Sequence, residues 1–338
     1  MTVSMRIWIS ALGFWIAVYL PQATIGVQAK ELENLSPMLI GLMWAMFGIA
    51  LVIARIPIGI ASVIFKEKSL LMVGLILIGL GLVIVPIISN PASLLVSRFL
   101  LGLGTGFWVI YTVLYVGLSQ KSIPAAMSEI TLAYGLGITI ASLIGGILVE
   151  WKGWFAPFWI GLVIVTGAIF ILAFTRIKDV VYADFKIDRL ILLFRNAKLI
   201  FVSFLAMIFF LVFFATVLGF NQNYVYEHFE IAPFWLGILM FSALLPYSLC
   251  IAVSHIIRNK LGLYQTIALG FTLAGFGIIG IPFAPNIGLI LFLHIIIGFG
   301  LGMIYPTLMA ESIKDVPDAM LGEAMGIFQS VYAIGIFL

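Results

Sequence analysis

Long apolar runs dominate this sequence and restrict what the chain can fold into. About 20 apolar residues, at a rise of 1.5 Å each, cross the ~30 Å hydrocarbon core of a bilayer. Because no water reaches the backbone there, such runs predict membrane-spanning α-helices, and the lack of period-two alternation excludes an outer-membrane barrel. Ten full runs and a partial one occur, at Ile7–Val27, Pro37–Ile64, Leu70–Ile88, Leu94–Leu118, Ala125–Val149, Phe155–Thr175, Leu199–Phe220, Trp235–Ile257, Leu263–Pro282, Ile287–Ala310 and Glu323–Leu338.

The charged residues lie almost entirely between these runs. Of the 31 charges (17 Lys and Arg plus 14 Asp and Glu), only Arg55, Arg98, Glu129 and Glu323 fall inside a run. A composition of 64% hydrophobic and 9% charged residues excludes a soluble globule, which carries roughly 25% charge. The net charge of +3 gives no reason to expect a nucleic-acid partner. The chain has one cysteine and no Cys/His cluster, so we expect no bound metal and no other cofactor. We also expect the protein to be a monomer in the lipid bilayer.

The basic residues of the loops predict the orientation in the cell membrane. If the N-terminus is cytoplasmic, the outside loops carry only Lys30 and Lys152, so the bias obeys the positive-inside rule. The thirteen basic residues of the inside loops are then Arg6, Lys66, Lys68, Lys121, Arg176, Lys178, Lys186, Arg189, Arg195, Lys198, Arg258, Lys260 and Lys314.

The longest hydrophilic stretch divides the chain into two parts. We interpret residues 176–198 as a cytoplasmic linker between a six-helix bundle at 1–175 and a second transmembrane bundle at 199–338. The two parts match without a gap when one is shifted by 196 residues. The identities pair Pro37 with Pro233, Gly41 with Gly237, Gly74 with Gly270, Gly79 with Gly275, Gly81 with Gly277, Pro86 with Pro282, Asn90 with Asn286, Gly102 with Gly298, Gly104 with Gly300 and Gly106 with Gly302. A further slip of two residues pairs Tyr134 with Tyr332. Such a repeat predicts that both halves need close backbone approach at the same depths, as in transporters built from parallel repeats.

Several motifs resemble those of the major facilitator superfamily over nearly the whole chain. Arg98 with Gly102, Gly104 and Gly106 resembles the Arg-x-x-x-Gly-x-Gly pattern of the fourth helix of that family. The remaining matches are Gly137, Gly145 and Gly146 in the fifth run, the loop Gly153–Trp159, and Arg55-Ile-Pro57-Ile-Gly59 before the loop that follows the second helix. The resemblance implies an all-α membrane protein of two six-helix bundles related by a pseudo-twofold axis. It also implies transport of a small solute by alternating access. The sequence has no His-Glu-x-x-His, Gly-x-Ser-x-Gly, paired intramembrane carboxylate or nucleotide-binding loop, so we expect no enzymatic activity.

The sequence departs from the family pattern at three places. After the second run, Val63, Ile64 and Lys66 replace the Asp, Arg and second Gly of the Gly-x-x-x-Asp-Arg-x-Gly motif, while Asn259-Lys260-Leu261-Gly262 holds the equivalent register in the second half. Ala141-Ser142 replaces the Gly-Pro that marks many antiporters. The family has twelve spans, and this sequence stops sixteen residues into the eleventh run, so we expect an incomplete second bundle of about four and a half helices.

Arg98 and His294 are the first candidates for substrate binding. Each lies eight residues, or ~12 Å of helix, past the matched Asn90 and Asn286. The resemblance implies that their helices line the central cavity, and a charge inside a span is costly enough to indicate a function. We hypothesise a cationic pair that receives an anionic or dipolar group. The alternative is that Arg98 braces helix packing and His294 is a satisfied interior histidine.

Other polar groups fall into a cavity set and a gate set. The proposed polar points of a mostly apolar cavity are Tyr19, Gln22, Tyr111, Tyr115, Asn221, Tyr305, Gln329 and Tyr332, each of which could equally be a packing residue. The gating or coupling set is Arg55, Glu129, His255, Asn259 and Lys260. We interpret Arg55 as snorkelling to the gate region with His255 in the same layer. We interpret Glu323 as an acidic residue of the kind favoured in the first turn of a helix. Glu129 has either the same role or that of a proton-binding or gate residue.

These observations favour a transporter for a small organic solute, anionic or polar. No carboxylate lies deep in a run, so proton coupling rests on His294 or Glu129, and a uniporter or exchanger stays open. The alternatives are an efflux pump for hydrophobic drugs and a truncated relic or sensor that does not transport.

Overall fold

The structure, a computed structural model, describes residues 2–31, 35–177 and 187–338 and is helical throughout, with no strand among these residues. The first half contains α1 (Val3–Tyr19), α2 (Ile25–Glu31), α3 (Pro37–Ile64), α4 (Glu67–Ile88), α5 (Pro91–Gly106), α6 (Trp108–Leu118), α7 (Ile123–Lys152) and α8 (Ala156–Ala173). The rest contains α9 (Ile187–Phe194), α10 (Ala197–Val212), the π-helix η1 (Phe213–Phe220), α11 (Asn221–Phe229), α12 (Pro233–Leu261), α13 (Leu263–Gly280), the 3₁₀ turn η2 (Ile281–Phe283), α14 (Ile287–Ile313), the 3₁₀ turn η3 (Asp318–Met320) and α15 (Leu321–Phe337).

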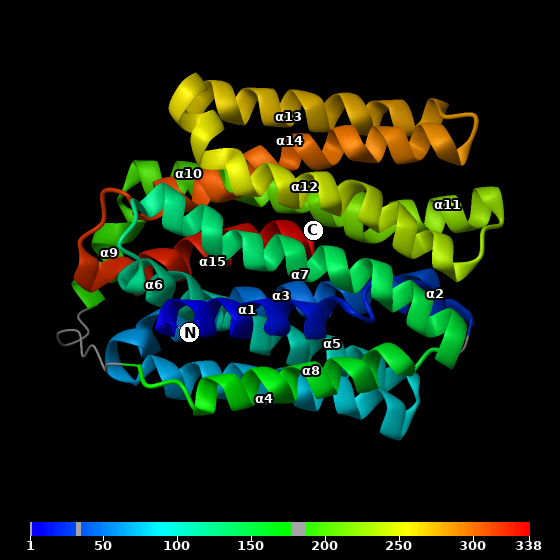
Figure 1. The fold of residues 1–338 in the computed structure, drawn as a ribbon, viewed down its shortest axis with the longest axis horizontal. Coiled ribbons are helices and arrows are strands. Elements are labelled where there is room, and N and C mark those ends of the chain that lie inside the picture. Colours follow the sequence, from blue (N-terminus) through cyan, green and yellow to red (C-terminus); the bar gives the residue numbers. More distant parts are fainter. Residues whose placement is uncertain (1, 32–34, 178–186) are drawn as a thin grey trace.

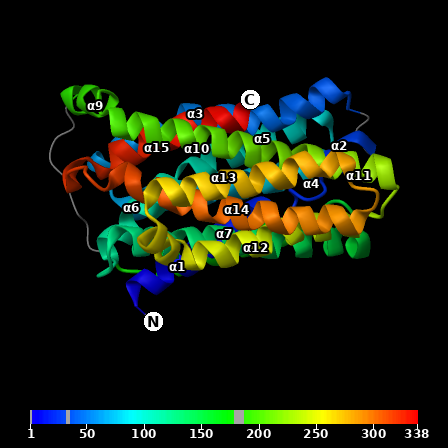
Figure 2. The same ribbon diagram turned by 90° about the horizontal axis from the view of Figure 1, so that it is seen from above.

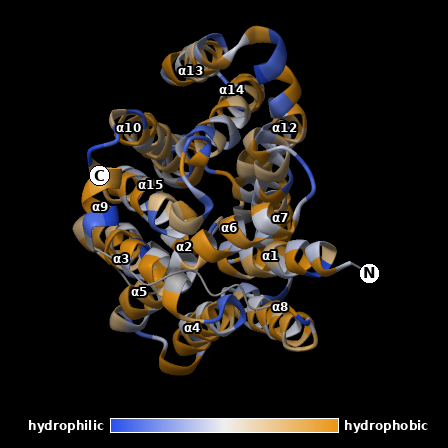
Figure 3. Ribbon diagram, turned by 90° about the vertical axis from the view of Figure 1, so that its left-hand side faces the viewer, coloured by the Kyte–Doolittle hydropathy of each residue, from blue (hydrophilic) through white to orange (hydrophobic). Residues whose placement is uncertain are grey.

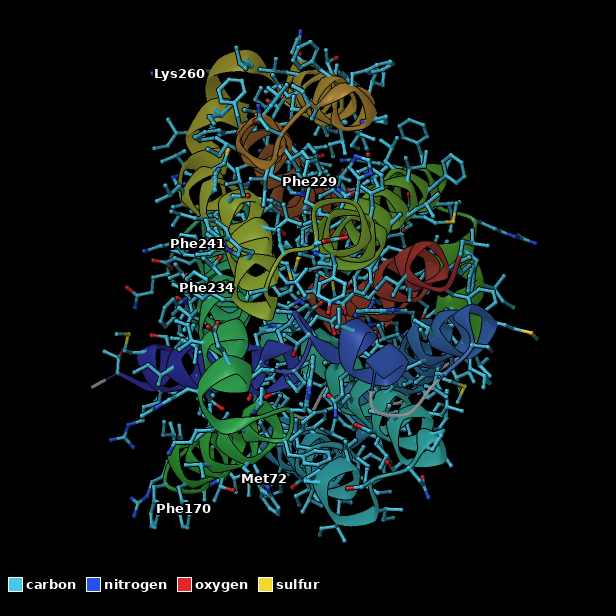
Figure 4. All side chains as sticks on the ribbon, turned by 90° about the vertical axis from the view of Figure 1, so that its right-hand side faces the viewer. Met72, Phe170, Phe229, Phe234, Phe241 and Lys260 are labelled. Atoms are coloured by element: carbon cyan, nitrogen blue, oxygen red, sulfur yellow. The ribbon has the colours of Figure 1, made fainter. Side chains whose placement is uncertain are left out.

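The prediction of membrane-spanning helices is confirmed. Ten helical segments of the described chain are long and apolar enough to cross a bilayer, and α1 is a shorter apolar helix. Their outward faces carry large apolar side chains, as a lipid-facing surface requires. Phe170 on the outside of α8 is 59% exposed, and Figure 4 shows it at the margin of the molecule. Hydrophilic residues gather at the loops of the end that faces the viewer in Figure 3.

Three of the predicted spans are discontinuous. The first ends as α1 at Tyr19 and resumes as α2 at Ile25, because Pro21 has no N–H to continue the helical bonds and its carbonyl instead accepts from the amides of Thr24 and Ile25. The fourth span is divided at Phe107, and the seventh widens into η1 before α11. Local departures of this kind inside spans are tolerated where the backbone is buried in protein or lines a cavity.

The helices run side by side, and α9 lies beyond one end of the bundle (Figures 1 and 2). We call this end the α9 end, and the end that carries α2 and α11 the α11 end. Most helices of the first half lie in the lower part of Figure 1, and α10 to α14 lie in the upper part. The two parts meet where α3 packs along α15 and α7 packs along α12.

The 196-residue register recurs in the packing of the helices. A Cβ added to Gly102 would lie 2.6 Å from the carbonyl oxygen of Phe47, and one added to Gly298 would collide with that of Ala243, which is 196 residues after Phe47. A Cβ added to Gly104 would lie 2.8 Å from the carbonyl oxygen of Gly74. In the second half, a Cβ added to Gly300 would lie 2.5 Å from that of Gly270, which is again 196 residues after Gly74. These two pairs of matched glycines therefore make the same helix contacts in both halves.

Small residues also allow the close approach between the halves. At the α9 end, a Cβ on Gly59 of α3 would lie 2.6 Å from the carbonyl oxygen of Gly322 of α15. Along the other seam, the hydroxyl of Ser128 on α7 hydrogen-bonds that of Ser254 on α12 at 2.9 Å. Thr139 donates to the carbonyl of Leu244 at 2.8 Å. Small and hydroxyl-bearing side chains of this kind are typical of helix contacts inside membranes.

Replacing Gly298 with alanine is therefore expected to destabilise the protein by about 1–3 kcal/mol, because the new methyl group meets the backbone of α12. The matched control is Gly275→Ala on α13, where an added Cβ has no neighbour within 4 Å. Melting temperatures of the two purified variants in detergent measure the difference. Equal melting temperatures would show that the close contact between α12 and α14 does not matter.

Candidate substrate cavity and its polar groups

A narrow cavity lies between the two halves. Its volume is about 10 Å³, roughly the room that one water molecule needs. It is lined by Trp15, Tyr19, Phe47, Leu51, Arg55 and Tyr134 from the first half and by Phe210, Phe214, Tyr305, Tyr332 and Ile336 from the second. Of these described residues, Arg55 alone carries a formal charge, and none is acidic.

Arg55 joins the halves at the cavity wall. Its side chain is only 2% exposed, its Nη1 donates to the carbonyl oxygen of Gln329 at 2.7 Å, and its guanidinium lies 4.4 Å from the ring centroid of Tyr332. Its Nε has no hydrogen-bond partner within the described residues. The expected snorkelling to the membrane surface is not what the structure shows, because the backbone carbonyl and the aromatic ring of α15 hold this charge inside the protein.

Arg98 lies behind the cavity wall, with its side chain 1% exposed. Its Nη1 donates to Oε1 of Gln22 at 2.9 Å, in the turn between α1 and α2. Its guanidinium lies 4.5 Å from the ring centroid of Phe47 and 5.0 Å from that of Trp44. Since Phe47 also lines the cavity, one aromatic ring separates Arg98 from it.

His294 takes the equivalent position in the second half. Its Nδ1 lies 2.8 Å from the carbonyl oxygen of Ile290, and its Nε2 lies 3.4 Å from the amide nitrogen of Asn221. Nδ1 therefore donates and Nε2 accepts, which is the pattern of a neutral ring. Arg98 and His294 are thus each bonded to an amide side chain at the break in the first span of their own half, and no contact joins them in the described structure.

The predicted tyrosines divide between the cavity and the surrounding packing. Tyr19, Tyr305 and Tyr332 line the cavity, and the hydroxyls of Tyr305 and Tyr332 lie 3.3 Å apart. Tyr111 does not line the cavity, and its hydroxyl forms a 2.7 Å hydrogen bond with that of Ser10. Gln329 is buried, and neither atom of its side-chain amide has a partner within the described residues.

The predicted gate residues lie toward the α9 end. Glu129 lies beyond the first turn of α7, accepts a 3.0 Å hydrogen bond from Tyr115 and pairs with Lys121. His255 is half-buried near the end of α12, where Asn259 and Lys260 are exposed.

Glu323 lies in the first turn of α15, as expected, but its side chain is not solvated. The residue is 1% exposed, and neither carboxylate oxygen has a hydrogen-bond partner among the described residues. This carboxylate is therefore buried at the start of α15 without a partner among the described residues.

The sequence analysis missed a charge cluster in the second half. Glu311 on α14, whose side chain is 2% exposed, pairs with Arg258 of α12 and, at 2.9 Å, with Lys198 of α10. Lys198 also donates to Asp315 at 2.6 Å, and this charge-assisted bond holds the pKa of the exposed Asp315 carboxyl below its usual value. Glu311 was overlooked because it lies one residue past the predicted span Ile287–Ala310, whereas α14 continues to Ile313. Its carboxylate links α10, α12 and α14.

The aromatic part of the cavity was also missed, namely Trp15, Phe47, Tyr134, Phe210 and Phe214. Two signals could have found some of it. Trp15 precedes Tyr19 by four residues and so shares its helix face. Tyr134 matches Tyr332 in the repeat, and both side chains line the cavity.

Comparison with known proteins decides the family. The family model described as Major Facilitator Superfamily matches residues 7–338. The chain belongs to the major facilitator superfamily. It is accordingly a multi-pass membrane protein of a transporter family, with the fold that the sequence motifs suggested.

Relatives and solved structures of the superfamily agree with this fold. An uncharacterized MFS-type transporter of Methanocaldococcus jannaschii is 23% identical over 98% of this chain and 88% of its own. An uncharacterized transporter of Buchnera aphidicola is 30% identical over 38% of this chain, which is 33% of that relative. The human organic anion transporter MFSD10 has a TM-score of 0.78 at 13% identity, with 100% of this chain and 92% of that one covered. The nucleoside transporter NupG has a TM-score of 0.77 at 13% identity, covering 99% and 89%.

Replacing Glu311 with glutamine is expected to lower the free energy of unfolding by about 3 kcal/mol, because Arg258 and Lys198 lose their buried counter-charge. Asp315→Asn is the control, since that exposed carboxylate contacts Lys198 in water and its loss has little effect. Thermal unfolding of both variants in detergent tests this. If Asp315→Asn is the more damaging change, the cluster is not the brace described.

Proposed function

We propose that this member of the superfamily carries a small organic anion across the cell membrane by alternating access. The observation that carries the proposal is Arg55, a buried cation on the wall of a cavity between the two halves, with no acidic residue among the described lining. The tyrosine hydroxyls and the indole N–H of Trp15 add hydrogen-bond donors around it. A solute that brings negative charge and acceptor atoms complements this lining.

The moving parts in this proposal are residues 1–175 and 199–338, joined by the linker at 176–198. Residues 178–186 of the linker, with Lys178 and Lys186, lie outside the described structure. Glycine, serine and threonine allow close contact along the seams of α3 with α15 and of α7 with α12, so rocking needs few large side chains to repack besides Arg55, Tyr332, Tyr134 and Tyr247. Rocking would open the cavity to one side of the membrane at a time.

The α9 end is assigned to the cytoplasm, together with the N-terminus. Exposed or half-buried basic side chains gather there; they include Arg6, Lys66, Lys68, Lys121, Arg195, Lys198, Arg258, Lys260 and Lys314. The opposite end carries Lys152 and, on α2, Lys30. This bias is the one that the positive-inside rule requires.

Arg55 also suggests how binding is coupled to movement. In the described state its Nη1 is held by the carbonyl oxygen of Gln329, a bond between the halves. An incoming carboxylate is a stronger partner for a guanidinium than a neutral carbonyl is. Binding would therefore weaken the tie between α3 and α15 and favour separation of the halves at the α9 end.

If transport is coupled to protons, Glu129 is the proposed proton-binding group rather than His294. His294 is buried with both ring nitrogens engaged, whereas Glu129 is partly exposed beside Lys121. The runner-up function is efflux of hydrophobic compounds, which the aromatic lining of the cavity favours.

Uptake into proteoliposomes tests the proposal, with benzoate, glutarate, glucose and a neutral hydrophobic dye as the probes. The anions are expected to be taken up and the neutral probes are not. Arg55→Gln is expected to lower anion uptake about tenfold or more, since a charge-assisted hydrogen bond contributes about 1.5–3 kcal/mol. Arg195→Gln, an exposed arginine near α9, is the matched control. Transport of the dye alone would replace this function with the runner-up.

A further inference from the structure

Two buried guanidinium groups in the first half share one unusual feature. Arg55 and Arg98 are 2% and 1% exposed, and neither takes part in an ion pair within the described chain. A buried charge without a counter-charge is expensive, and natural proteins almost always pair it. The buried Glu323 does not serve, because neither of its oxygens has a partner among the described residues. Each of these two guanidinium groups therefore lacks a negatively charged partner within the described residues.

Arg98 presents a complete binding edge. Its Nη1 donates to Gln22, and its guanidinium lies within 5.0 Å of the ring centroids of Trp44 and Phe47. Its Nε and Nη2 have no partner in the described structure. These two N–H groups point in parallel from one edge of a guanidinium, which is the fork that matches the two oxygens of a carboxylate. The side-chain nitrogen Nε2 of Gln22 is a third unpartnered donor on the residue that Arg98 contacts.

Arg55 offers the second point. Its Nε is unpartnered, and the cavity reaches its side chain. Phe47 and Arg55 are eight residues apart on α3, which places Phe47 about 12 Å farther along the helix. Because Phe47 contacts the guanidinium of Arg98 and also lines the cavity, Arg98 and Arg55 lie at different depths beside the cavity.

We propose that the transported solute is a small dicarboxylate, which rests on the anion transport proposed above. One carboxylate takes the Nε and Nη2 edge of Arg98, and the other takes Arg55, once the ring of Phe47 has turned aside. A monocarboxylate neutralises only one of the two cations. Inorganic phosphate carries its charges on one centre and cannot reach both.

The first test uses the wild-type protein in proteoliposomes, with straight-chain diacids from malonate to adipate, the monoacids butyrate and hexanoate, and phosphate as probes. We expect one or more of the longer diacids to be taken up at least about tenfold better than the monoacids, because the second ion pair adds a charge-assisted bond. Equal uptake of monoacids and diacids would overturn the dicarboxylate proposal and leave anion transport standing. Absence of uptake for every anion would overturn the proposed function itself.

The second test assigns the preference to Arg98. In Arg98→Gln, the ratio of diacid to monoacid uptake should fall to about one, whereas Arg195→Gln should keep the wild-type ratio. Arg98→Lys keeps the charge but loses the fork, so its ratio should lie between the two. Elution as a single species on gel filtration shows that each variant is folded. Should Arg98→Gln not fold, the binding of glutarate and butyrate to the wild-type protein by calorimetry decides the question, and equal affinities contradict the proposal. An unchanged ratio in a folded Arg98→Gln also contradicts it.

Discussion

Close backbone contact through glycine is the constraint on which the rest of this structure depends. In hydrocarbon the helices gain nothing from hiding apolar side chains from water, so they associate by packing and by hydrogen bonds. Gly102 and Gly298 allow α5 and α14 to approach α3 and α12 so closely that a methyl group does not fit. Since the same contacts occur 196 residues apart, α3 with α5 and α12 with α14 pack in the same way in the two halves, and the cavity lies where the halves meet.

The buried charges are organised by this packing in two different ways. Glu311 pairs with Arg258 and Lys198 and braces the helices of the second half at the α9 end. Arg55 and Arg98 have only neutral partners, namely a carbonyl, an amide and aromatic rings. A satisfied ion network is suited to holding one half rigid, whereas an unpaired cation at the boundary is suited to receiving an anion from outside the protein.

Much of the fold follows from the sequence, while the inside of the site does not. The length of the apolar runs predicts the spans, and the glycine register predicts matching contacts in the two halves. The depth of Arg98 and His294 is also readable, since each lies eight residues past a helix-capping asparagine. What cannot be read is the rotation of each helix. A span that is apolar on every side does not show which face turns inward, so Phe47 and Phe210 look no different from residues that face lipid. The break at Pro21 was visible as a proline, but its effect, which is to place Gln22 against Arg98, needs the packed structure.

The central claim is that two rigid halves rock about a cavity that contains Arg55. The most direct measurement is double electron–electron resonance in liposomes, with Cys250, the only cysteine, replaced by serine. One spin-label pair at Lys121 and Asp318 reports the α9 end, and a second pair at Ala92 and Pro285 reports the opposite end. The account predicts opposite changes when glutarate is added, with one distance lengthening as the other shortens. Two distances that stay fixed, or that lengthen together, would contradict it.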